Sequence, residues 1–201
     1  AAAAVTVQWD HGPAATLSSA AVMTQLTQAL DQTQGFGYYS VGDVDQALQG
    51  AATTLTADYR APYLAHATME PINCTVQFKD GAASVWTSTQ VPGLARMAAA
   101  KALGIDEDKV TVHQLLLGGG FGRRLEVDYV AQAAAIAKAA GGAPVQTLWS
   151  REQDMQHDFY RPACVARFKA GLDAQGQLVA WHNVSAGQAI VPQVLARTFG
   201  L

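Results

Sequence analysis

The chemistry-bearing stretch of this sequence is GGGFGRR at residues 118–124, where glycines, one phenylalanine and two arginines are adjacent. A strand-like apolar run, 109–117, precedes it, and a helical pattern, 126–141, follows. A glycine loop between a strand and a helix start can bind anions, because free backbone N–H groups and the helix dipole converge there. These residue types therefore predict a site for a negatively charged or oxygen-rich group.

Neither of the two familiar phosphate loops matches this segment. A Walker loop ends in Gly-Lys-Ser/Thr, whereas this loop ends in glycine and two arginines. A dinucleotide fingerprint needs a third small residue where Arg123 or Leu125 stands. The loop must therefore serve a ligand or a packing role of another kind.

The two arginines at the expected helix start are a second unusual feature. Cations in a first helical turn oppose the helix dipole by a few tenths to about 1 kcal/mol. We therefore expect an anion, or carboxylates such as Glu126 and Asp128, beside Arg123 and Arg124. The alternative is two solvated arginines on a surface loop. Phe121 has two interpretations as well: a hydrophobic plug that packs the loop onto the sheet, or an aromatic side chain presented at a crowded place.

Composition limits the class of protein. Of the 201 residues, 50% are apolar and only 14% are charged, which is typical of a packed globular protein. A net charge of -3 argues against a dedicated nucleic-acid surface, and no apolar run is long enough to span a membrane. Two cysteines, Cys74 and Cys164, are too few for a disulfide scaffold or an iron–sulfur cluster, so we expect buried free thiols.

Periodicity predicts the elements that must position the loop. Expected strands are 4–10, 53–60, 109–117 and 144–150, and 74–78 and 83–89, which we expect to form a hairpin that turns at 79–81. A second hairpin is expected over 164–187, with its turn at 173–176. Expected helices are 20–32, 44–51, 93–104 and 126–141. These elements predict an α+β fold, a two-layer mixed β-sheet with packed helices. We expect residues 1–58 to form a small α/β piece and residues 59–201 a second domain.

Other polar residues give weaker signals. His66 and Glu70 would be i, i+4 neighbours on a helix, a spacing that can hold a metal, but Pro62 and Pro71 favour an irregular segment. Glu70 could instead accept hydrogen bonds from loop N–H groups. The charged stretch 150–163 is interpreted as a loop, either functional or simply solvated. Residues on strand patterns that we expect in the core are Trp86, Trp149 and Trp181.

Four separated segments, in this order, resemble the molybdopterin-binding large subunit of the xanthine dehydrogenase and aldehyde oxidase family, closest to its isoquinoline 1-oxidoreductase β-subunit branch. They are YLAHATMEP at 63–71, VWTSTQVP at 85–92, GGGFGRR at 118–124 and the helix pattern at 126–141. The resemblance covers about residues 59–190 well and the first 58 more loosely. It implies a molybdenum-cofactor-binding-domain-like fold, in which 59–201 is part of the molybdopterin-binding domain and the chain is a fragment of a longer subunit.

The resemblance also implies roles for individual residues. Gln90 matches the family glutamine that hydrogen-bonds an oxo or dithiolene group at the molybdenum, and Phe121 matches a phenylalanine beside the metal and the substrate. Gln90 and Phe121 are therefore the candidate catalytic residues. The candidate cofactor-binding residues are Gln90, Gly119, Gly120, Phe121, Gly122 and Arg123. No protein ligand to a metal is expected, because the dithiolene of the cofactor supplies the ligands to molybdenum.

The implied activity is hydroxylation of an aldehyde or an N-heterocycle at carbon. Leu125 stands where xanthine dehydrogenases have a purine-binding glutamate, which disfavours purines. The family's general base, a glutamate, has no counterpart here, so we expect this fragment to be inactive alone. Expected partners are a small subunit carrying 2Fe–2S clusters, a cytochrome as a further candidate, the remainder of the large subunit and a small-molecule substrate.

Some questions stay open at the level of sequence. The compartment is undecided between periplasm and cytoplasm. Two alternatives to the enzyme interpretation remain: a non-catalytic phosphate- or anion-binding module that uses the same loop, and an assembly module whose loop serves only packing.

Overall fold

The computed structural model describes residues 6–32 and 35–199, which form two compact units. The first unit combines the chain up to Tyr63 with Pro162–Gln193, and the second combines Leu64–Arg161 with the segment from Val194 onward. The first unit thus takes in a segment that the expected 59–201 domain would contain. The assignment of 59–201 to cofactor binding stays a prediction.

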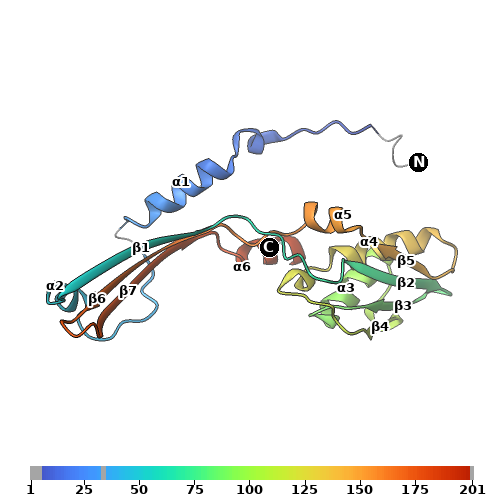
Figure 1. Ribbon diagram of the computed structural model, residues 1–201. Helices are drawn as coiled ribbons and strands as arrows, with labels where there is room; N and C mark the ends of the chain where they lie inside the picture. The colour runs from blue at the N-terminus through green and yellow to red at the C-terminus, as the bar shows by residue number, and fades with distance from the viewer. Residues whose placement is uncertain (1–5, 33–34, 200–201) are drawn as a thin grey trace. The chain divides into compact units, whose positions relative to one another are not determined.

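The second unit contains a four-stranded mixed sheet (Figure 1). Its strands are β2 (Asn73–Lys79), β3 (Ala82–Thr87), β4 (Val110–Gln114) and β5 (Val145–Leu148), in the order β4-β3-β2-β5. β2 pairs antiparallel with β3 and β5, whereas β3 and β4 are parallel because a helix connects them. The predicted hairpin around residues 79–81 and the predicted mixed sheet are confirmed.

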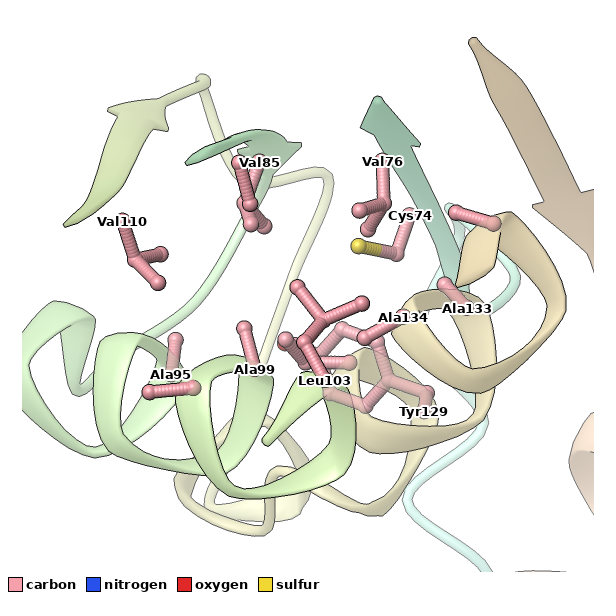
Figure 2. Close-up of a cluster of buried hydrophobic side chains, with 14 of the residues drawn as sticks. Cys74, Val76, Val85, Ala95, Ala99, Leu103, Val110, Tyr129, Ala133 and Ala134 are labelled. Carbon is pink, nitrogen blue, oxygen red and sulfur yellow. The ribbon is translucent and has the colours of Figure 1, made fainter. Parts of the chain in front are cut away.

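Two alanine-rich helices, α3 (Pro92–Leu103) and α4 (Asp128–Ala139), cover one face of this sheet (Figure 2). Alanines allow the two helices to approach each other and the sheet closely, and Gly104 ends α3 in the left-handed conformation with φ 74°. The buried core consists of Ile72, Cys74, Val76, Ala83, Val85, Ala95, Ala99, Ala100, Leu103, Val110, Tyr129, Val130, Ala133, Ala134 and Ala137. This α+β packing of helices on a sheet confirms the predicted fold class.

The first unit contains an antiparallel sheet in the order β1-β6-β7, formed by β1 (Thr53–Ala61), β6 (Cys164–Leu172) and β7 (Leu178–Gly187). The helices α1 (Ser19–Ala29) and α2 (Val44–Gln49) begin at the expected caps, where Ser18 and Asp43 accept hydrogen bonds from backbone N–H groups. The last helix is α6 (Val191–Phe199). Among the described helices, none has the length and apolar character that a membrane crossing requires.

Some expectations were wrong. The strand expected at 4–10 is absent from its described part, 6–10, and residues 4–5 lie outside the described residues. The strand expected at 109–117 ends at Gln114, because the chain then leaves the sheet to enter the glycine loop. Trp181 is 56% exposed on its sheet and is not a core residue, whereas Trp149 packs against the core.

The segment 150–163 is not simply a loop, because it contains the helix α5 (Arg151–Gln156). The side chain of Ser150 accepts a hydrogen bond from the backbone of Gln153, and the Gln153 side chain accepts one from the backbone of Ser150. This reciprocal capping box starts the helix and was a signal present in the sequence.

Cys74 provides a test of the packed core. Cys74 is fully buried between β2 and the helices, and burial raises its thiol pKa to about 12. Because the thiolate is the reactive form, we expect Cys74 to resist iodoacetamide at pH 8 in the folded protein and to react after denaturation. Mass spectrometry of alkylated peptides measures this directly. Rapid native labelling of Cys74 would contradict the core described above.

Candidate functional site

The glycine loop runs from the end of β4 to α4 and includes a short 3-10 turn, Arg123–Leu125. Gly119, Phe121 and Gly122 all have positive φ, of 101°, 52° and 105°. Such values suit glycine, but a phenylalanine adopts them only when its surroundings enforce the conformation. The loop is therefore a constrained turn, and its neighbours must supply the constraint.

Close packing explains the other two glycines. A Cβ atom at Gly118 would lie 2.4 Å from the Cβ of Glu70, and one at Gly120 would lie 2.6 Å from the Oε1 of Gln90. The loop backbone thus approaches both side chains more closely than any other residue type permits.

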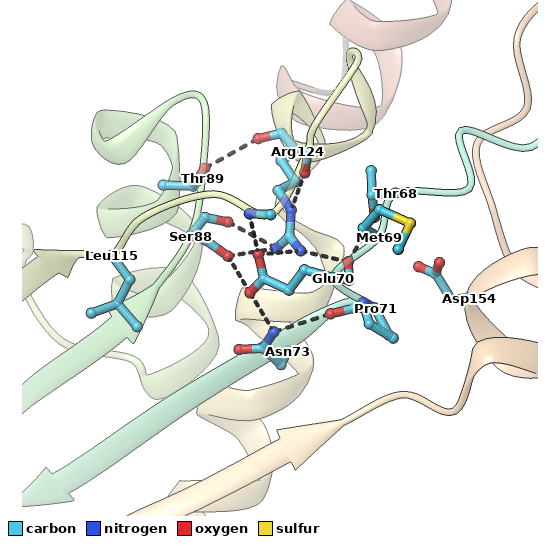
Figure 3. A network of polar contacts seen from close by, with 12 residues as sticks. Thr68, Met69, Glu70, Pro71, Asn73, Ser88, Thr89, Leu115, Arg124 and Asp154 are labelled. Carbon is cyan, nitrogen blue, oxygen red and sulfur yellow. Dashed lines mark hydrogen bonds and ion pairs between the residues drawn. The ribbon is translucent and has the colours of Figure 1, made fainter.

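Arg124, whose side chain is fully buried, provides the first constraint. Figure 3 shows its polar contacts. Its guanidinium donates to the carbonyl of Gly119 at 3.0 Å, to the carbonyl and hydroxyl of Ser88 at 3.0 and 2.8 Å, and to the carbonyl of Glu70 at 3.0 Å. The Glu70 carboxylate lies 3.2 Å away and neutralises the buried charge. One side chain thereby joins three separate segments of the chain.

The carboxylate of Glu70 completes this network. It accepts hydrogen bonds from the N–H of Gly118 at 2.7 Å, the amide of Asn73 at 2.7 Å and the hydroxyl of Ser88 at 2.9 Å. Burial alone would raise the pKa of Glu70, but these donors and Arg124 together lower it below its ordinary value. The expectation that Glu70 binds a loop N–H group is confirmed.

Arg123 is held by a second set of carboxylates. Its guanidinium makes a bidentate pair with Asp128, at 2.9 and 3.0 Å, and its Nε lies 3.1 Å from Asp158. The rings of Trp149 and Phe159 lie 5.5 and 5.1 Å from the guanidinium carbon, within cation–π range. Arg123 is 1% exposed, so its charge is satisfied inside the protein.

These contacts decide between the two interpretations of the arginines. Arg123 and Arg124 are buried and paired, so the expectation of solvated surface arginines is wrong. Asp128 is one of the predicted partners, whereas Glu126 pairs with Arg197 instead. Both guanidinium groups already have protein partners. An external ligand at this loop would therefore meet backbone N–H donors and not a free cation.

His66 and Glu70, the two residues considered as metal ligands, belong to different polar networks. His66 bonds Asp158 through Nδ1, at 3.0 Å, while Glu70 belongs to the Arg124 network. Within the described part of the chain, no three His, Cys, Asp or Glu side chains gather as a metal site would require. Glu70 accepts a hydrogen bond from the N–H of Gly118, and the ring of His66 lies near Gly122.

The crest of the loop, residues 119–121, lies beside Gln90, with Phe121 exposed, Gly119 partly buried and Gly120 buried. The Oε1 of Gln90 accepts a hydrogen bond from the N–H of Gly122 at 3.1 Å, which leaves its amide nitrogen available as a donor. None of the described residues accepts a hydrogen bond from the backbone N–H of Gly119, Gly120 or Phe121. The crest N–H groups and the amide nitrogen of Gln90 are therefore donors without an acceptor among the described residues.

Phe121 points away from the core and is 65% exposed. The hydrophobic-plug interpretation is therefore wrong, and the ring is available to contact a ligand. The structure thus brings together Gln90, Gly119, Gly120, Phe121 and Gly122, with Arg123 supporting them from inside. Asp158 could not be predicted as a site residue, because its partners His66 and Arg123 are far away in the chain.

Comparison with known proteins identifies the class to which this site belongs. Residues 27–189 match the family model of the molybdopterin cofactor-binding domain. The chain therefore belongs to this family, that of the xanthine dehydrogenase and aldehyde oxidoreductase large subunits.

Three relatives illustrate the similarity. The chain is 35% identical over 187 residues to a membrane-bound aldehyde dehydrogenase [pyrroloquinoline-quinone] of Gluconacetobacter polyoxogenes, covering 92% of this chain and 24% of the relative. It is 42% identical over 131 residues to the isoquinoline 1-oxidoreductase subunit beta of Brevundimonas diminuta, covering 64% of this chain and 16% of the relative. The structure of quinoline 2-oxidoreductase from Pseudomonas putida 86 has the same fold over 71% of this chain and 18% of that one, with a TM-score of 0.59 at 20% identity. The chain thus spans about a quarter or less of the length of these proteins.

The Glu70 network predicts a pH-dependent stability. Glu70→Gln leaves Arg124 without its carboxylate partner. We expect the free energy of unfolding to fall by about 3 kcal/mol near pH 7. This is the low end of the range for a broken buried ion pair, because Arg124 keeps its carbonyl acceptors. The pKa of Glu70 is lowered on folding, so its contribution is fully present above the ordinary value of 4.5 and is lost as the pH falls through the lower folded value.

Urea unfolding of wild type and Glu70→Gln between pH 3 and pH 7 measures this effect. The difference in unfolding free energy should be constant above about pH 5.5 and shrink below about pH 4.5. A difference independent of pH over the whole range would contradict the charge-based account.

Proposed function

We propose that this chain is part of the molybdopterin-binding subunit of an oxidoreductase that hydroxylates an aldehyde or an N-heterocycle at carbon. The observation that carries the proposal is a set of hydrogen-bond donors without an acceptor among the described residues, formed by the backbone N–H groups at 119–121 and the amide nitrogen of Gln90. Oxo and dithiolene groups are hydrogen-bond acceptors, so a molybdenum cofactor fits a site built from donors alone.

The residues of this chain would hold and orient the cofactor. Gln90 would donate to an oxo or dithiolene group, and the glycines at 119, 120 and 122 would let the backbone come within hydrogen-bonding distance. The bound cofactor would supply the redox-active molybdenum at which the substrate carbon is oxidised. Arg123 would contribute by fixing the loop, since its guanidinium is already engaged with protein carboxylates.

The surroundings of the loop favour an apolar substrate. Phe121 and Leu125 are 65% and 45% exposed beside the crest, so they can form an apolar wall. The nearest acidic residues in sequence, Glu126 and Asp128, are paired with Arg197 and Arg123. Relatives named for isoquinoline, aldehyde and nicotinate are 42%, 31% and 31% identical, and a xanthine dehydrogenase subunit is 28% identical, which favours an aldehyde or N-heterocycle over a purine.

Catalysis would require parts outside this chain. The general base and the remaining cofactor contacts would come from the rest of the large subunit, and electrons would leave through 2Fe–2S clusters of a small partner subunit, with a cytochrome as a further candidate. Relatives named as subunits support this arrangement. This chain alone would accordingly be inactive.

The two alternatives agree less well with the geometry. A phosphate-binding module would present a free cation, but both loop arginines are buried and paired. An assembly module would bury Phe121 within the fold, but the ring is exposed. The name of one relative includes pyrroloquinoline quinone. The family model over residues 27–189 concerns molybdopterin, and other relatives are named as molybdenum-binding subunits, which favours molybdopterin.

Elemental and fluorescence analysis of the full-length protein, purified with its partner from the native host, tests the proposal. We expect stoichiometric molybdenum and the fluorescence of oxidised pterin. A well-folded complex with neither, or with pyrroloquinoline quinone in place of pterin, would refute it.

The exposed position of Phe121 predicts a separation of stability from function. Phe121→Ala should change the unfolding free energy by less than about 1 kcal/mol, because surface side chains contribute little. In the full-length enzyme the same change should alter substrate KM and turnover. A stability loss of about 3–5 kcal/mol, as for a buried aromatic, would favour the packing role instead.

For the substitution of Gln90 we predict a large decrease in turnover. Gln90→Ala removes one preorganised donor, and we expect kcat in the full-length enzyme to fall about 100-fold. The matched control is Gln175→Ala, which changes an exposed glutamine in the turn between β6 and β7. Equal turnover of the two variants would exclude a direct role for Gln90.

A further inference from the structure

The two ends of the glycine loop are held in different ways. At the first end, Glu70 accepts a hydrogen bond from Gly118, and Arg124 donates one to the carbonyl of Gly119. At the second end, Gln90 bonds the N–H of Gly122, but Gln90 is itself an exposed side chain. A φ of 105° is unstrained for Gly122, but the φ of 52° at Phe121 is strained and depends on how its neighbour Gly122 is held.

The imidazole of His66 is the group nearest to the side of Gly122 on which a side chain would stand. A Cβ atom at Gly122 would be 3.5 Å from the Nε2 of His66 and 4.0 Å from its Cδ2, which is van der Waals contact. The side chain of His66 is only 10% exposed, so the ring fills the space behind the loop. Its Nε2 makes no hydrogen bond to any described residue.

Asp158 fixes the orientation of this ring. Its carboxylate accepts from the Nδ1 of His66, 3.0 Å from both oxygens, and from the backbone N–H of the same residue. Holding both the backbone and the ring of one residue leaves the imidazole little rotational freedom. Asp158 is in turn 2% exposed and 3.1 Å from the Nε of Arg123, although that N–H is not aligned for a hydrogen bond.

We propose that His66, oriented by Asp158, is a positioning residue that supports Gly122 and thereby sets the backbone of Phe121. The charge balance is consistent with this role, because Arg123 offsets Asp158 and its pair with Asp128 anchors the start of α4. The effect on turnover rests on the proposed function, whereas the effect on the loop itself does not.

The chemistry of Asp158 makes the proposal testable. Three N–H groups face its carboxylate: the backbone N–H and Nδ1 of His66 and the Nε of Arg123. In Asp158→Asn, the amide NH2 group would therefore face another donor and could not accept its hydrogen bond. We expect Asp158→Asn to free the imidazole of His66 and to release Gly122. In the full-length enzyme with its partner, amide hydrogen exchange of the peptide covering 118–125 should accelerate at least about tenfold, while the β2–β3 hairpin, 73–87, keeps its wild-type exchange.

Two variants of His66 separate its two contacts. His66→Asn keeps a nitrogen that can donate to Asp158 but removes the ring atoms against Gly122, so it should loosen the loop as Asp158→Asn does. His66→Gln can reach toward Gly122 and should loosen it less. The matched control is Asp58→Asn, a carboxylate paired with Arg167 in the first unit, which should leave the exchange of 118–125 unchanged.

The outcomes distinguish this inference from the function proposed above. Unchanged loop exchange in both Asp158→Asn and His66→Asn would overturn the positioning role, as would a uniform increase across the second unit that only reflects a lower Tm. If the wild-type enzyme holds molybdopterin, His66→Asn should also shift KM and kcat by different factors at unchanged molybdenum content. If the wild type holds no molybdopterin, the proposed function fails, while the exchange data still decide the role of His66.

Discussion

The burial of two adjacent arginine side chains is the constraint on which this site depends. Arg123 and Arg124 are 1% and 0% exposed, and a buried cation is tolerated only when carboxylates and carbonyl oxygens replace its water. Arg124 recruits Glu70, and Arg123 recruits Asp128 and Asp158. These ion pairs connect distant segments of the chain to one loop. They also determine which loop atoms have no hydrogen-bond partner among the described residues.

The core of the second unit supplies the rigid frame for these pairs. The alanine faces of α3 and α4 lie close on the sheet, and the start of β2 and the end of β3 lie beside each other near the start of α4. The hydroxyl of Tyr129 donates to the carbonyl of Ser88 and fastens the start of α4 to the segment carrying Gln90. The backbone N–H groups of Gly119, Gly120 and Phe121 have no acceptor among the described residues, and these are the groups that would meet a cofactor.

Much of the fold was predictable because it follows from local patterns. Alternating residues predicted the β2–β3 and β6–β7 hairpins, and Ser18, Asp43 and Gly104 marked helix ends. The strand expected near the start failed because alternation alone does not supply a neighbouring strand. The glycine loop and the contact of Glu70 with it were predictable from residue type, but the pairing of His66 with Asp158 was not, because it joins residues 92 positions apart and depends on tertiary structure.

A crystal structure of the full-length subunit with its partner and bound cofactor would test the central claim most directly. The account predicts that acceptor atoms of molybdopterin or its molybdenum centre lie within about 3.2 Å of the crest N–H groups or of the Gln90 amide nitrogen. It also predicts that Arg123 and Arg124 keep their carboxylate partners in that complex. A cofactor bound elsewhere, or one paired directly with either arginine after the Asp128 or Glu70 contact had broken, would contradict it.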